Sequence, residues 1–148
     1  MSKNRGSGRA KPAPNPTSPR AFQKAALQRL TTAEFLLDHK YNLDAMYLAG
    51  YTIECSLKAL ILELTPPPEY PAKLKLISSG KRMHDPEVLA GLLKDLGNPI
   101  PLPFVKRFRR FQWSTSLRYQ TGRTNSSQTG GFLKLAKEIH NWVEGQLS

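Results

Sequence analysis

The residues best suited to chemistry lie four positions apart in an otherwise apolar segment. Glu54 and Lys58 fall within residues 47–61, which are hydrophobic on nearly every face of a helix. A helix of that composition is buried, and a buried charge must be paired or hydrogen-bonded. An acidic residue four positions before a basic one is the favourable order for an ion pair along a helix. We therefore expect either a shielded intrahelical pair or a polar site that faces a groove between helices.

Two further candidates are His84 and Asp85, which precede an apolar segment that starts at Pro86. An aspartate followed by a proline at the first helical position is typical of a helix N-cap. His84 either hydrogen-bonds the local backbone or acts as a general base, a role that requires a substrate within reach. We group Glu54, Lys58, His84 and Asp85 as a predicted buried polar site.

A third set of candidates lies between Asp95 and Glu138, a stretch that contains no acidic residue. A block with one sign of charge favours the binding of polyanions. Arginine can bind a phosphate through two hydrogen bonds, and tyrosine or tryptophan can stack on bases. The predicted nucleic-acid or nucleotide contacts are Lys106, Arg107, Arg109, Arg110, Arg118, Tyr119 and Arg123.

Two alternatives remain open for this block. Its charges can form a solvated surface that only aids solubility. Trp113 and Tyr119 can also fill the core beneath a loop, while Arg118 pairs with a carboxylate such as Glu54.

The overall composition indicates one folded domain with a basic tail. The chain has 148 residues and a formal net charge of +11, and its length suits a single domain. The first 20 residues contain four prolines and five basic residues but no acidic or aromatic residue. Such a segment cannot bury enough apolar surface to fold. We predict a disordered basic tail over residues 1–18 and a helical domain over residues 19–148.

Hydrophobic periodicity in that domain predicts helices and no strand pair. Apolar residues recur at steps of three and four positions, the spacing of one helix face. The expected helices are Pro19 to His39, Leu43 to Leu64, Asp85 to Leu96, Pro101 to Phe111 and Gly131 to Leu147. Residues 65–83 are expected to form a loop with some helical potential, and residues 112–128 are rich in turns. The pattern favours an all-α, up-and-down bundle of four to five helices.

The sequence also excludes several kinds of site. Cys55 is the only cysteine, so neither an intramolecular disulfide nor a cysteine-based zinc site can form. There is no glycine-rich phosphate loop and no histidine pair at metal spacing, so we expect no cofactor and no metal. The N-terminus has no apolar stretch, and the longest apolar run, residues 45–53, is too short to span a membrane. We expect a cytoplasmic protein without membrane contact.

Taken together, these motifs resemble the HEPN domain family, the higher eukaryotes and prokaryotes nucleotide-binding domains. The resemblance extends over about residues 19–146 and rests on three features. They are the segment Tyr47 to Ile61, the pair His84-Asp85 at a helix start, and Trp113-Ser114 with Arg118-Tyr119 before a terminal amphipathic helix. The resemblance implies an up-and-down helical bundle, usually dimeric, and a place in a toxin–antitoxin, defence or RNA-processing system.

Some members of that family are metal-independent ribonucleases, and others pair with a small nucleotidyltransferase. The ribonucleases carry an arginine followed four to six residues later by a histidine, whereas no histidine follows Arg118 in residues 119–125. The leading hypothesis is therefore a nucleotide-binding, RNA-binding or partner subunit that forms a homodimer and works with a nucleotidyltransferase. One alternative is a ribonuclease with a diverged site, in which Glu54, His84 and Arg118 converge. Another is a purely structural interaction module.

Overall fold

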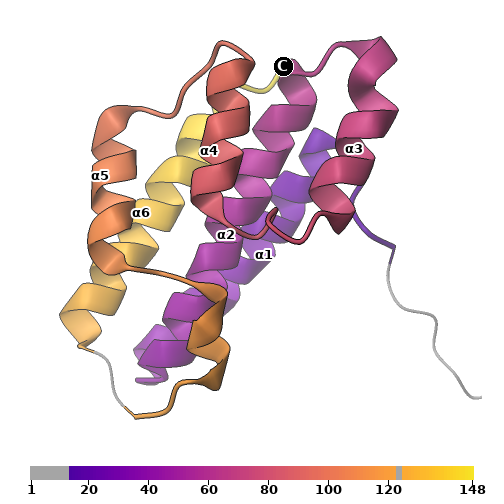
Figure 1. Cartoon of the computed structure of the whole chain (residues 1–148). Helices are drawn as coiled ribbons and strands as arrows, with labels where there is room; N and C mark the ends of the chain where they lie inside the picture. The colour runs from indigo at the N-terminus through magenta and orange to yellow at the C-terminus, as the bar shows by residue number, and fades with distance from the viewer. Residues whose placement is uncertain (1–13, 123–124) are drawn as a thin grey trace, which may run out of the picture.

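The computed structural model describes residues 14–122 and 125–148, and these form helices without any strand (Figure 1). The α-helices are α1 (Pro19–Asp38), α2 (Asn42–Leu64), α3 (Tyr70–Ser79), α4 (Pro86–Asp95), α5 (Leu102–Phe111) and α6 (Ser126–Glu144). Two 3₁₀ helices, η1 (Pro67–Glu69) and η2 (Thr115–Tyr119), lie between them. The predicted all-α class is confirmed. Most of the predicted tail, residues 1–13, lies outside the described residues.

Helix α2 is the core of the bundle and packs against α1, α6 and α4. Its buried residues come from every face, and Ile53, Leu57 and Ile61 are almost fully inaccessible to solvent. Among the described helices, α2 is long and apolar enough to cross a membrane, but 78% of its apolar window is buried inside the protein. Burial on all sides is expected of the central helix of a bundle.

Side-chain caps set the starts of three helices. Ser18, Asp85 and Asn125 each accept hydrogen bonds from backbone N–H groups in the first turn of α1, α4 and α6. The cap predicted at Asp85 is therefore present. Because Asn125 caps the chain at this point, α6 begins at Ser126 and not at the predicted Gly131.

The segment predicted as a loop, residues 65–83, contains η1 and α3. Pro66 follows α2 directly, as expected of a residue that cannot continue a helix. Pro71 occupies the first turn of α3, where a missing backbone N–H breaks no helical hydrogen bond. Ile77 is fully buried and attaches α3 to the core.

Segments from three parts of the fold lie on one face of the bundle (Figure 1). They are the turn of residues 80–85 before α4, the 3₁₀ helix η2, and α5 with its neighbour α6. Helix α2 lies behind this face and contacts both α4 and η2, while α5 packs on α6. The face therefore collects most of the residues that the sequence marks as candidates.

Candidate functional site

A buried carboxylate lies at the centre of the predicted polar site. The Glu54 side chain is only 7% exposed, and Lys58 Nζ donates a hydrogen bond of 2.8 Å to its Oε2. His84 Nδ1 lies 3.2 Å from both carboxylate oxygens. Glu54 therefore pairs within its own helix and also holds the turn before α4. The shielded intrahelical pair considered from the sequence is therefore present, and His84 links it to the turn.

The outer members of this group reach solvent. The His84 side chain is 55% exposed, and Asp85 is exposed as well. Because Nδ1 faces Glu54, Nε2 is the ring nitrogen left for a ligand, and it has no partner among the described residues. A carboxylate at one imidazole nitrogen fixes both the tautomer and the ring orientation. Glu54 thus positions His84, while Lys58 balances the buried charge.

Trp113 is anchored in the core under the start of η2. Its indole Nε1 donates a 3.0 Å hydrogen bond to the carbonyl of Met46, and the residue is 7% exposed. The ring lies directly on Gly50, where a Cβ atom would collide with it. The interpretation that Trp113 fills the core is correct. The same interpretation is wrong for Tyr119, which is 76% exposed.

A chain of contacts links the polar site to η2. The hydroxyls of Tyr47 and Tyr51 are 2.7 Å apart, and the Tyr51 ring lies edge-on to His84 with centroids 6.4 Å apart. Burial raises the pKa of Tyr51, and the Tyr47 hydroxyl and the Glu54 charge raise it further. Tyr51 therefore stays protonated and can only share its proton with a neighbour.

Arg118 lies at the outer end of that chain. Its guanidinium carbon is 4.9 Å from the centroid of the Tyr119 ring, and contact with Tyr119 and Tyr47 raises the pKa of Arg118. Arg118 forms no ion pair with Glu54 in the described part of the chain, so the interpretation that pairs these two residues is wrong. The Arg118–Tyr119 pair is instead an exposed cation stacked on an aromatic ring.

Two arginines of α5 are held by carboxylates from other helices. Arg107 donates two hydrogen bonds, of 3.0 and 2.9 Å, to Glu138 of α6. Arg109 binds both oxygens of Glu87 in α4 at 2.8–3.1 Å. These hydrogen bonds lower the pKa of each carboxyl group and raise that of each arginine. The block without acidic residues in sequence thus has carboxylates beside it in space.

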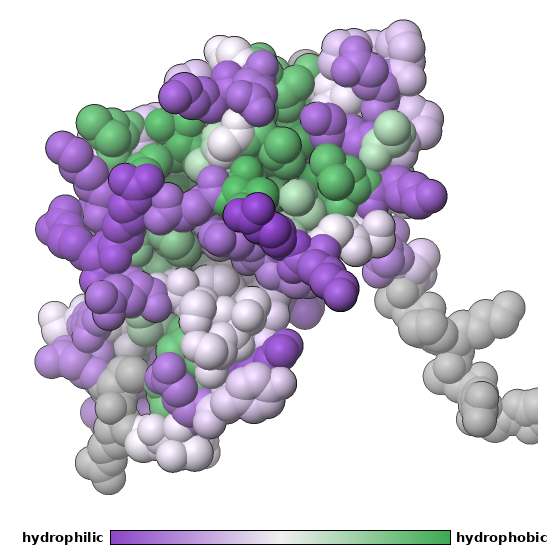
Figure 2. All heavy atoms as spheres, viewed as in Figure 1, coloured by the Kyte–Doolittle hydropathy of each residue, from purple (hydrophilic) through white to green (hydrophobic). Residues whose placement is uncertain are grey.

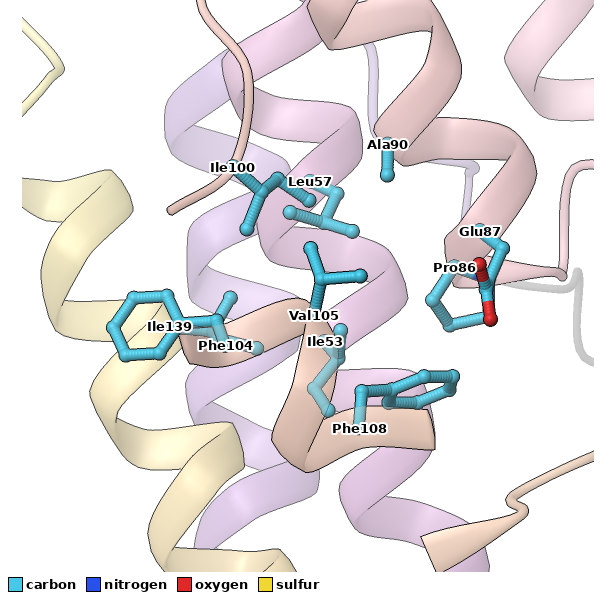
Figure 3. Close-up of a pocket in the computed structure, with 10 residues that line it drawn as sticks. All are labelled: Ile53, Leu57, Pro86, Glu87, Ala90, Ile100, Phe104, Val105, Phe108 and Ile139. Atoms are coloured by element: carbon cyan, nitrogen blue, oxygen red, sulfur yellow. The ribbon is translucent and has the colours of Figure 1, made fainter. Parts of the chain in front are cut away.

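An apolar hollow lies between α4 and α5, with Glu87 among the residues that line it (Figure 3). Glu87 also forms the ion pair with Arg109 of α5. Helices α4 and α5 do not pack on each other, and Ile53, Val105 and Phe108 line the gap of about 30 Å³ between them. That volume is close to the space of about one water molecule. The ion pair is a polar link between these two helices, and it joins Arg109 of α5 to α4.

The other cations of α5 remain available. Lys106 and Arg110 are exposed and have no carboxylate partner among the described residues. Hydrophilic atoms gather over α5 on the surface (Figure 2). A cleft of about 380 Å³ between α5 and α6 is lined by Arg107, Arg110, Phe111, Gln128, Gly131 and Lys134. This surface, called the α5–α6 cleft below, combines an aromatic ring with cations. Arg123 of the predicted set lies outside the described residues.

Sequence reasoning missed residues on both sides of the site. Lys81 and Arg82 line a cleft beside His84, and Gln128 lines the α5–α6 cleft. The signal for the first two was a basic pair directly before the predicted cap. Gln128 lay in a segment that was expected to form turns, so its place on a helix face was not foreseeable.

Comparison with known proteins gives one match. The sequence model of a single family, described as the HEPN domain, matches residues 20–146. No curated protein and no solved structure was found to match the chain. The matched range covers every helix except the first residue of α1, Pro19, and it includes every candidate residue described above.

Proposed function

Because the chain belongs to the HEPN domain family, we propose that it is an RNA-binding module that holds phosphates in the α5–α6 cleft. Family membership supports a role related to nucleotides or RNA in general. The assignment to RNA is carried by one observation: Arg110 and Lys134 line a cleft beside Phe111, and neither forms a salt bridge within the described residues. Lys134 lies near enough to Glu138 that its charge, after the hydrogen bonds from Arg107, also lowers the pKa of that carboxyl group.

The cleft has the chemistry of a phosphate-binding surface. Arg107 is held rigid by Glu138, so its charge is largely neutralised, while Arg110 and Lys134 keep theirs. Charged contacts of this kind bind nucleic-acid phosphates without reading the sequence. The exposed Tyr119, with Arg118 over its ring, offers a second platform on which a base of the same strand can stack. Together these groups suit single-stranded RNA.

The proposal includes the cellular setting predicted from the family resemblance. We expect a homodimer in the cytoplasm, acting as partner subunit of a nucleotidyltransferase in a toxin–antitoxin or defence-type system. A pull-down of the tagged protein from its host, with nuclease-treated and untreated halves, tests this. One stoichiometric protein that survives nuclease treatment would support the partner role, and recovery of RNA alone would contradict it.

Binding itself is tested by fluorescence anisotropy with a labelled single-stranded RNA at rising salt. The affinity should fall steeply as the salt concentration increases, because bound cations displace counterions from the phosphates. The double variant Arg110→Ala, Lys134→Ala should bind much more weakly than the wild type. Absence of binding at low salt would overturn the proposal.

A second candidate, metal-independent RNA cleavage, is favoured by the contact between His84 and Glu54. A histidine oriented by a carboxylate can transfer protons at a reacting phosphate. Arg118, however, contacts Tyr119 and Tyr47 and forms no ion pair with Glu54 in the described part of the chain. RNA cleavage without metal that is lost in His84→Ala would favour this candidate. Cleavage that persists in both His84→Ala and Arg118→Ala would exclude it.

A further inference from the structure

A second cleft, which shares no lining residue with the α5–α6 cleft, lies between the turn before α4 and the start of η2. Its volume is about 210 Å³. Lys81, Arg82 and His84 form one wall, and Ser114 and Thr115 form the other. On the surface, strongly hydrophilic atoms at this turn adjoin paler atoms over η2 (Figure 2). We call it the His84 cleft.

Both walls are held in place by the core. The turn is fixed by His84, whose ring binds Glu54, and by Met83, which is 9% exposed and belongs to the hydrophobic core. The opposite wall is fixed by Trp113, whose indole is bound to the carbonyl of Met46. A cleft with anchored walls needs little reorganisation when a ligand enters, and this lowers the cost of binding.

The polar groups of the His84 cleft suit an anion. Lys81 and Arg82 are exposed and have no carboxylate partner among the described residues. The one carboxylate in the lining is Asp85, which accepts a hydrogen bond of 2.9 Å from the backbone N–H of Glu87. Two cations therefore face one partly occupied carboxylate. On the other wall the Thr115 hydroxyl supplies an uncharged hydrogen-bond donor. The Ser114 hydroxyl lies beside it, accepts a hydrogen bond from the backbone N–H of Ser116 and is 2.6 Å from the Ser116 hydroxyl.

The size of the cleft limits what that anion can be. Pockets for whole small-molecule ligands are about 300–1,000 Å³. At about 210 Å³ the His84 cleft can enclose one end of a nucleotide but not the whole. A phosphodiester inside an RNA strand would also have to bring a nucleotide on each side into this space. A terminal phosphate enters alone and carries a second negative charge.

We propose that the His84 cleft binds a phosphate monoester, either the terminal phosphate of an RNA or the phosphate of a free mononucleotide. The RNA source rests on the proposed function, while the mononucleotide source is independent of it. Arg82 and Lys81 bind the phosphate oxygens, and Thr115 donates a hydrogen bond from the opposite wall.

The test compares ligands that differ only in the monoester. One labelled RNA sequence is prepared with a 5′-hydroxyl, a 5′-phosphate or a 3′-phosphate, and AMP is compared with adenosine. For the full chain we expect RNA with one of the two phosphorylated ends to bind about tenfold more tightly than 5′-hydroxyl RNA, or AMP to bind more tightly than adenosine by a similar factor. Arg82→Ala should remove this gain and leave the affinity for 5′-hydroxyl RNA unchanged. The matched control is Lys75→Ala, which removes an exposed cation from α3.

The outcomes test the phosphate site independently of the proposed RNA binding. Equal affinities for all three RNAs, together with equal affinities for AMP and adenosine, would overturn the phosphate site even if RNA binds. A phosphate gain that survives Arg82→Ala would overturn it as well. If no RNA binds, but AMP binds more tightly than adenosine and Arg82→Ala removes that difference in affinity, the phosphate site stands and the proposed function fails. Circular dichroism verifies that each variant is folded.

Discussion

His84 Nδ1 lies 3.2 Å from both carboxylate oxygens of Glu54, and this contact joins an exposed turn to the buried centre of α2. The same carboxylate accepts a 2.8 Å hydrogen bond from Lys58. A buried ion pair alone is weak grounds for stability, because desolvation offsets the attraction. The position of the Glu54 carboxylate has a second consequence, because its contact with His84 fixes one wall of the His84 cleft.

The variant Glu54→Gln tests the buried pair. It leaves Lys58 charged and unpaired in the core, so the free energy of unfolding should fall by about 3–5 kcal/mol. Urea denaturation followed by circular dichroism measures the change. The double variant Glu54→Leu, Lys58→Met removes both charges and should recover most of the loss. A loss of less than about 1 kcal/mol, the value for an exposed pair, would contradict the buried assignment.

Gly50→Ala tests the close contact between α2 and Trp113. A Cβ atom at Gly50 would collide with the indole ring, so the ring must move. We expect about 1–3 kcal/mol of destabilisation, as for other overpacked cores, and a red shift of tryptophan fluorescence. Gly91→Ala is the matched control because nothing lies within 4 Å of its Cβ position in α4. That variant should gain about 0.5–1 kcal/mol from helix propensity. Equal effects in both variants would contradict the contact.

Cys55 should be an unreactive thiol at neutral pH. Burial, together with the nearby Glu54 charge, raises its pKa to about 12. Since only the thiolate reacts, a thiol reagent at pH 8 should modify folded protein at least about tenfold more slowly than urea-unfolded protein. Equal rates in the two states would contradict this prediction.

The same shift has a consequence for stability. The folded state holds the Cys55 proton more tightly than the unfolded state, so the protonated thiol contributes to the free energy of unfolding. This contribution is fully present below the ordinary pKa of 9.0 and is lost as the pH rises towards about 12. The unfolding free energy of wild type should therefore fall more steeply above pH 9 than that of Cys55→Ser.

Several features of this fold follow from short-range patterns in the sequence. The apolar composition around Glu54 predicts the central helix, and Asp85 before a proline predicts a capped helix. Both depend on neighbours within one turn, and the structure contains both. The extra helix α3 was missed because three prolines and a serine-glycine pair obscure its weak periodicity, although Ile77 anchors it.

The partners of the basic residues could not be read from the sequence in the same way. Arg107 and Arg109 look equivalent to Arg110, yet they reach Glu138 and Glu87 on other helices. Those contacts depend on how α5 is placed relative to α4 and α6. Only the arrangement of helices in space separates the bound arginines from the available one.

Tyr119→Ala tests the exposed stacking platform. If a base stacks on this ring, its removal should weaken RNA binding by about 1–3 kcal/mol, while Tyr119→Phe should retain most of the affinity. Competition binding with an unlabelled single-stranded RNA measures both. Tyr41→Ala, which truncates another exposed tyrosine, serves as the control. Equal affinities for Tyr119→Ala and the wild type would remove Tyr119 from the interface.

The central claim is that the α5–α6 cleft binds RNA phosphates through cations that form no salt bridge within the described residues. The most direct test is the slope of log affinity against log salt for Arg110→Ala, Lys134→Ala and Arg109→Ala. Each lost phosphate contact should reduce the slope by about 0.7, the value for a single strand. We predict this reduction for Arg110→Ala and Lys134→Ala but not for Arg109→Ala, whose charge is bound to Glu87. Identical slopes for all three variants and the wild type would contradict the account.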